Sequence, residues 1–145
     1  MLQIAFIREN QEKVIKALAK RSFDATELIQ LVVELDEKRR STQVELDNIL
    51  AESNKLSKEI GELMKTGKKE EALVLKEQTA TFKESTKNLT EILNSVTEQL
   101  TQELYKLPNT PADIVPEGKT ADDNLNIFES GEIPTLHEGA VPHWD

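Results

Sequence analysis

The stretch that decides the fold is residues 56–75, LSKEIGELMKTGKKEEALVL, in which a glycine-containing turn separates two segments of helical periodicity. Apolar residues recur at helical spacing on both sides of the turn, at Leu56, Ile60, Leu63, Ala72 and Leu75. Gly67 suits the end of a helix, because glycine readily adopts the left-handed conformation that often closes one. We therefore predict the tip of a helical hairpin, with its turn at residues 65–69.

An alternation of four- and three-residue steps, typical of coiled coils, extends outward from the tip in both directions. Before the turn, the ladder consists of Leu28, Val32, Leu35, Arg39, Thr42, Leu46, Ile49, Ser53, Leu56, Ile60 and Leu63. After the turn, it consists of Ala72, Leu75, Thr79, Phe82, Thr86, Leu89, Leu93, Val96, Leu100, Glu103 and Leu107. Leu104 is expected to take the place of Glu103. Eight of the eleven positions in each ladder are apolar, which predicts two long helices over about residues 26–64 and 70–107.

The two ladders fit each other when the chain folds back at Gly67. Leu63 then faces Ala72, and the correspondence continues without a slip until Leu28 faces Leu107. No polar ladder residue faces another polar one. We therefore expect an antiparallel two-helix coiled-coil hairpin, whose first arm is about 54 Å long at about 1.5 Å per residue.

The segments outside the hairpin predict shorter or irregular structure. One or two short helices over residues 2–21 are expected to pack at the base of the hairpin. Asp24 followed by Glu27 fits a capping box that opens the first long helix. Pro108 and Pro111 end the second helix, and the tail beyond them is expected to be irregular, with at most one short strand. The fold class is therefore all-α, with a hairpin domain at residues 1–107 and a linker at residues 108–145.

Composition excludes several functional classes. The chain has no cysteine, which excludes disulfides, thiolate catalysis and cysteine-based zinc sites. The sequence contains no P-loop, GxGxxG, GxSxG or paired-histidine metal motif, and a two-helix seam offers no cavity that could shelter reacting groups. We therefore expect no catalytic, cofactor-binding or metal-binding residues. No apolar run is long enough to span a membrane, and we expect a cytoplasmic protein.

Charge is distributed unevenly along the chain, whose formal net charge is −9. The tail from Pro108 carries eight acidic residues and one lysine, whereas residues 55–69 carry five lysines and two glutamates. The candidate residues for contact with nucleic acid are Asn54, Lys55, Lys58, Lys65, Lys68, Lys69 and Lys76 near the tip, with Arg40 in the middle of the first arm. The tip has no aromatic residue, so we expect contacts to phosphate and ribose rather than base stacking. The alternative is a solvated tip with no ligand.

Arg40 belongs to a basic run, Lys38 to Arg40, that has two interpretations. Arg39 falls on the seam and is expected to extend its side chain outward toward solvent. Its neighbours could form ion pairs with Glu98, Glu103 or other acidic residues of the returning helix, or they could contact nucleic acid.

Several segments resemble, in order, the N-terminal domain of bacterial seryl-tRNA synthetases. The matching segments are residues 6–10 (FIREN), 35–40 (LDEKRR), 51–61 (AESNKLSKEIG), 107–118 (LPNTPADIVPEG), 123–124 (DN) and 142–145 (PHWD). Gln11 and Ser53 depart from the proline and arginine that are frequent at these positions of the family. The resemblance covers essentially the whole chain.

The resemblance implies a tRNA-binding arm that holds the long variable arm of tRNA(Ser). In this family, serine is joined to its tRNA with ATP and Mg²⁺ by a class II catalytic domain, which would lie beyond Asp145. The resemblance further implies a homodimer formed through that domain, and we expect the isolated arm to be a monomer without catalytic activity. A structural or chaperone-like hairpin that binds protein is the alternative, but it leaves residues 107–118 and 142–145 unexplained.

Overall fold

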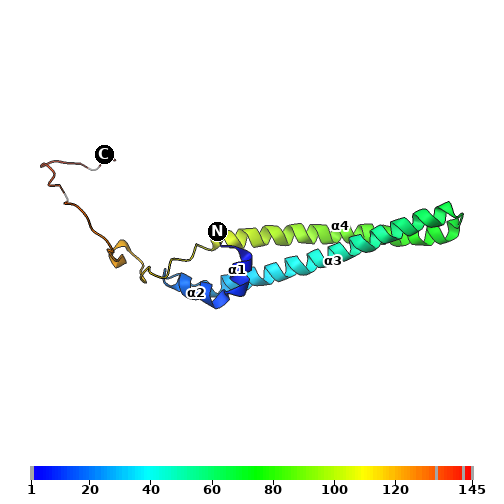
Figure 1. Ribbon diagram of the computed structural model, residues 1–145, viewed down its shortest axis with the longest axis horizontal. Coiled ribbons are helices and arrows are strands. Elements are labelled where there is room, and N and C mark those ends of the chain that lie inside the picture. The colour runs from blue at the N-terminus through cyan, green and yellow to red at the C-terminus, as the bar shows by residue number, and fades with distance from the viewer. Residues whose placement is uncertain (1, 133, 142, 145) are drawn as a thin grey trace.

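The computed structural model describes residues 2–132, 134–141 and 143–144. Its elements are α1 (Ile4–Glu9), α2 (Gln11–Ala19), α3 (Thr26–Lys65), α4 (Lys69–Lys106) and a short 3-10 helix, η1 (Ala121–Asp123). The helices α3 and α4 run antiparallel along the length of the molecule, while α1 and α2 lie at the end remote from the turn (Figure 1). The 40 residues of α3 span about 60 Å. The all-α hairpin with short helices at its base is therefore confirmed.

The seam of the hairpin is formed by the predicted ladders. None of the 22 ladder residues is exposed; each is buried or half-buried. Leu104 is buried, while the Glu103 carboxylate forms an ion pair with Lys106 at 2.7 Å. Two residues of α3 outside its ladder, Ile29 and Asp36, are also completely buried, because α3 packs against α1 and α2 as well as against α4.

The turn at the tip closes as the glycine predicts. Gly67 has φ +81°, and its N–H donates to the Met64 carbonyl at 3.4 Å. The Lys68 N–H donates to the Leu63 carbonyl at 3.0 Å. These two bonds form the Schellman arrangement that ends α3 and allows α4 to begin at Lys69.

The base of the hairpin holds a compact apolar core. The cluster consists of Ile7, Val14, Leu18, Ala25, Ile29, Val32, Leu100, Leu104 and Leu107. Because buried Ala25 occupies the N-cap position of α3, the predicted capping box is wrong. Asp24 instead accepts a hydrogen bond from the Thr26 N–H at 3.0 Å, which lowers the pKa of Asp24.

A buried carboxylate joins α1 to α3. Asp36 is 0% exposed, and it accepts hydrogen bonds from Arg8 at 2.7 Å and from Arg39 at 3.0 Å. Burial raises the pKa of Asp36, but the hydrogen bonds and charges of Arg39 and Arg8 outweigh burial, so the net shift is downward. Arg39 is therefore held by its own helix. The expected pairing of this basic run with Glu98 or Glu103 is wrong, because Arg40 lies 3.6 Å from Glu37, also in α3.

The chain leaving α4 is fixed to the end of α2. Lys20 donates to the Asp113 carbonyl at 3.0 Å, and Arg21 donates to the Asn109 carbonyl at 3.2 Å. The Gly118 N–H in turn donates to the Lys20 carbonyl at 3.1 Å.

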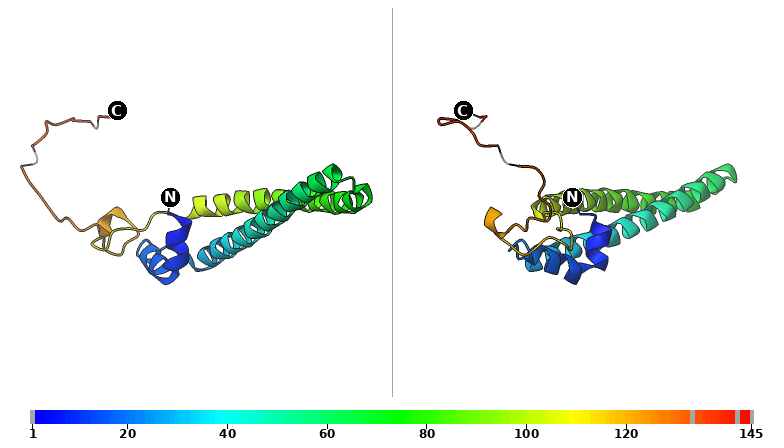
Figure 2. Two further views of the ribbon diagram at one scale, coloured as in Figure 1. Left: turned by 45° about the vertical axis from the view of Figure 1, so that its right-hand side comes forward. Right: turned by 60° about the vertical axis from the view of Figure 1, so that its left-hand side comes forward.

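Beyond Gly118 the tail leads away from the base (Figure 2). Asp123 accepts hydrogen bonds from the backbone of Lys119 and Thr120 at the start of η1, and these bonds lower its pKa. The tail contains no strand in its described part, so the short strand allowed for it is not formed. Pro142 and Asp145, which belong to the resemblance noted above, lie outside the described residues.

None of the helices in the described part of the chain is both long and apolar enough to cross a membrane.

Candidate nucleic-acid interface

The hairpin brings seven of the eight candidate residues to its tip. All eight side chains are exposed: Asn54, Lys55, Lys58, Lys65, Lys68, Lys69, Lys76 and Arg40. Arg40 lies 25 residues before the end of α3, which places it about 38 Å from the turn. The structure therefore separates Arg40 from the lysines of the tip.

Three lysines of α4 line one side of the tip. An open groove between the helices is bordered by Ser57 and Ile60 of α3 and by Lys76, Thr79, Ala80 and Lys83 of α4. It continues toward the turn past Met64, Lys69, Ala72 and Leu73. We call this side the lysine groove. Its lysines, Lys69, Lys76 and Lys83, are spaced by seven residues, and its lining includes no acidic side chain among the residues that the structure describes.

Lys83 was not among the candidates predicted from the sequence. It lies farther from the turn than the other lysines, but it shares a face of α4 with Lys69 and Lys76, because seven residues make almost two helical turns. The seven-residue repeat of lysine was the signal that could have identified it.

The outer face of α3 adjoins the lysine groove and carries three more candidates. Asn54, Lys58 and Lys65 are separated by four and seven residues, so they project from one side of the helix. Gly61 lies among them, and a Cβ atom added to Gly61 would meet no atom within 4 Å. The glycine therefore leaves a stretch of helix backbone open between two lysines.

The remaining two candidates lie beside acidic residues. The Lys68 ammonium is 3.2 Å from the Glu71 carboxylate, and Lys68 shares a surface hollow with Glu59 and Glu62. Lys55 has Glu52 and Glu59 one helical turn away on either side. These neighbours reduce the positive potential at Lys55 and Lys68. Glu62 lies one turn from both Lys58 and Lys65 and reduces the potential there less, because one glutamate is shared between two lysines. The lysine groove is therefore the most basic part of the tip, followed by the outer face of α3.

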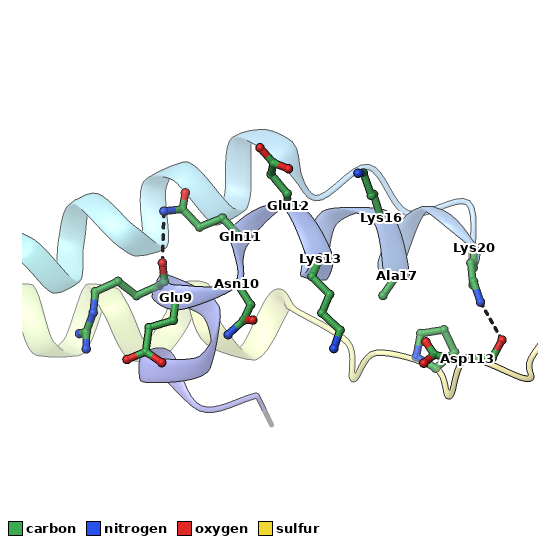
Figure 3. A pocket seen from close by; sticks show the side chains of 11 residues that line it. Glu9, Asn10, Gln11, Glu12, Lys13, Lys16, Ala17, Lys20 and Asp113 are labelled. Atoms are coloured by element: carbon green, nitrogen blue, oxygen red, sulfur yellow. Dashed lines mark hydrogen bonds between the residues drawn. The ribbon is translucent and has the colours of Figure 1, made fainter.

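A second hollow lies at the base, between α1, α2 and the segment that leaves α4 (Figure 3). Its basic side chains are Arg8, Lys13, Lys16 and Lys20, and its acidic ones are Glu9, Glu12 and Asp113. Because both signs of charge alternate there, the hollow does not offer the concentrated positive potential that a polyanion needs.

The fold agrees with what known proteins show. The family model for the seryl-tRNA synthetase N-terminal domain matches residues 1–111. The chain belongs to this family. As a seryl-tRNA synthetase N-terminal domain, it is similar over its full length to longer relatives. A serine–tRNA ligase of Mesoplasma florum is 39% identical over 146 residues, and this chain covers 34% of it. A serine–tRNA ligase of Haloarcula marismortui is 41% identical over 147 residues, with 32% covered.

A solved structure supports the same assignment. Seryl-tRNA synthetase from Pyrococcus horikoshii, crystallised in complex with ATP, matches with a TM-score of 0.77 and 30% sequence identity. The match covers 88% of this chain and 28% of the solved chain. The N-terminal domain described here therefore spans about a third of the length of these relatives.

Proposed function

We propose that this domain is the tRNA-binding arm of a seryl-tRNA synthetase and that its tip holds the long variable arm of tRNA(Ser). The main support for this proposal is that the chain belongs to the seryl-tRNA synthetase N-terminal domain family. The relatives are serine–tRNA ligases about three times as long as this chain. In the full-length protein, a catalytic domain would attach serine to the tRNA with ATP and Mg²⁺, in the cytoplasm where translation occurs.

The physical properties of the hairpin suit such an arm. Two packed helices about 60 Å long form a stiff rod, and the exposed cations gather at the end remote from the base. Lysine is a flexible point charge that contacts phosphate without reading bases. The tip would therefore recognise the shape of an RNA duplex rather than its sequence.

The burial of apolar surface within the hairpin bears on the oligomeric state of the isolated domain. The ladder residues of α3 and α4 satisfy each other within one chain, so the isolated domain is expected to be a monomer. We propose that the full-length protein is a homodimer formed through its catalytic domain. Sedimentation of the isolated domain tests the first statement, and a tight dimer would contradict it.

The proposal is tested by separating two activities of the full-length protein. Replacing Lys55, Lys58, Lys68 and Lys69 by glutamate turns attraction for phosphate into repulsion. We expect a large rise in the KM for tRNA(Ser) and unchanged serine-dependent pyrophosphate exchange, because adenylate formation would occur in another domain.

The comparison of the two activities decides the outcome. Selective loss of tRNA charging supports the arm as a tRNA clamp, and each lost phosphate contact should lower the salt slope by about 0.7 to 0.9. Charging that survives the four replacements unchanged would refute the role of the tip. Circular dichroism of the variant controls for misfolding, which would reduce both activities together.

A further inference from the structure

The outer face of α4 carries a row of glutamates. Glutamate recurs every seven residues along the helix, at Glu70, Glu77, Glu84, Glu91 and Glu98, and all five side chains are exposed. Seven residues make almost two turns, so the row stays on one face with a drift of about 20° per repeat. That face is opposite the ladder of α4. We call this row the glutamate stripe.

The flank of the hairpin that faces away from the lysine groove is also acidic. Glu45, Glu52 and Glu59 recur every seven residues along α3, and each side chain is at least partly exposed. Glu71 of α4 stands on the same flank, where it pairs with Lys68. Around the tip half of the rod, two adjoining sides are therefore basic or neutral, and the other two sides are acidic.

This charge pattern coincides with an absence of ion pairs in the lysine groove. Among the described residues, the ion pairs of the hairpin tip comprise only that of Lys68 with Glu71. Lys69, Lys76 and Lys83 are thus left to solvent or to a ligand. The opening beside Gly61 lies on the same basic half of the surface, where a phosphate backbone could approach the helix closely.

We propose that RNA docks on the hairpin from one side only, across the lysine groove and the outer face of α3, and that the glutamate stripe repels RNA from α4. This inference rests on the proposed function and adds the orientation of the bound RNA. It assigns Lys76 and Lys83 a larger role than Lys55 and Lys68.

The distance to the stripe differs between the faces of the hairpin. Each helix is about 10 Å across, so the stripe lies about 20 Å from the outer face of α3. The Debye length at physiological salt is about 8 Å. RNA on the outer face of α3 is therefore screened from the stripe, whereas RNA on the outer face of α4 meets five carboxylates directly. The lysine groove lies between these two faces, and each of its lysines directly precedes a glutamate of the stripe.

Two variants of the full-length protein with the same change in net charge test the proposal. The first replaces Lys69, Lys76 and Lys83 by glutamine, and the matched control replaces Lys13, Lys16 and Lys106, which are exposed at the base of the hairpin, by glutamine. We expect the groove variant to bind tRNA(Ser) at least about tenfold more weakly and to lose about two units of salt slope. The control should change affinity by less than about threefold. Equal effects of the two variants would overturn one-sided docking.

A third variant tests the glutamate stripe. Replacing Glu70, Glu77 and Glu84 by glutamine should raise the affinity for an unrelated RNA duplex severalfold at low salt. The affinity for tRNA(Ser), which docks on the neighbouring lysine groove, should rise by a smaller factor. Unchanged duplex binding would overturn the repulsive role. If the groove and control variants behave alike while the fourfold lysine-to-glutamate variant loses charging, one-sided docking fails and the tRNA-binding function stands.

Discussion

Replacing Asp36 by asparagine tests whether the buried carboxylate holds α1 against the hairpin. The substitution keeps the size of the side chain but removes its charge and one of its two acceptor oxygens. Hydrogen bonds to charged groups contribute about 1.5 to 3 kcal/mol each, and Asp36 accepts two of them. Arg8 and Arg39 are 32% and 33% exposed, so water can solvate them when they lose their partner. We therefore expect the free energy of unfolding to fall by about 2 to 3 kcal/mol.

The adjacent residue provides the control for this experiment. Glu37 is 73% exposed and lies 3.6 Å from Arg40, so replacing Glu37 by glutamine should cost less than about 0.5 kcal/mol. Urea denaturation of both variants, followed by circular dichroism at neutral pH, measures the difference. Surface ion pairs contribute about 0.5 kcal/mol. If the free energies of unfolding of Asp36→Asn and Glu37→Gln differ by less than this amount, the Asp36 carboxylate does not hold the base together.

Three further predictions follow from the same structure. The folded-state pKa of Asp36 lies below its ordinary value of 3.8. The stability that Asp36 contributes is therefore present above pH 3.8 and is lost as the pH falls through the folded-state pKa. In urea titrations, the difference in the free energy of unfolding between wild type and Asp36→Asn should close below about pH 4. Gly61→Ala should raise the free energy of unfolding by about 0.5 to 1 kcal/mol, because alanine favours the helix and its Cβ meets no atom within 4 Å; a lower denaturation midpoint would contradict this. Gly118→Ala would place a Cβ atom 2.5 Å from the Cβ of Asp123, so amide exchange at residues 118–123 should accelerate, while Gly139→Ala, in open space but with positive φ, should leave that exchange unchanged.

The hairpin could be predicted from the sequence because a coiled coil is a local, one-dimensional pattern. Each ladder residue is fixed by its distance along the helix, and Gly67 marks where the pattern reverses. The base was harder to predict, because α3 packs there on two sides. Asp36 and Ile29 lie off the ladder, and the packing of α1 and α2 against α3 explains why both are buried. Buried Ala25 likewise displaced the expected cap at Asp24.

The candidate interface was predictable in location but not in detail. A cluster of lysines in the sequence indicated the tip, because a hairpin brings both sides of its turn together. Which lysines share a side depends on their angle around each helix, and distance from the turn alone did not reveal it. That is why Lys83 was missed and why Lys68, which pairs with Glu71, was included. Contact of the candidates with tRNA stays a prediction.

The attachment of residues 109–118 to α2 determines where the arm can pivot. Lys20 and Arg21 hold this segment by its carbonyl groups, and Gly118 returns a bond to Lys20. The first backbone without hydrogen bonds to α2 or its C-terminal end therefore follows Gly118, rather than the prolines that end α4. Because the hairpin is about 60 Å long, a rotation of about 5° at its base displaces its tip by about 5 Å. This displacement is about the diameter of one phosphate group. The stiffness of these few hydrogen bonds therefore determines how precisely the arm can position the lysines at its tip.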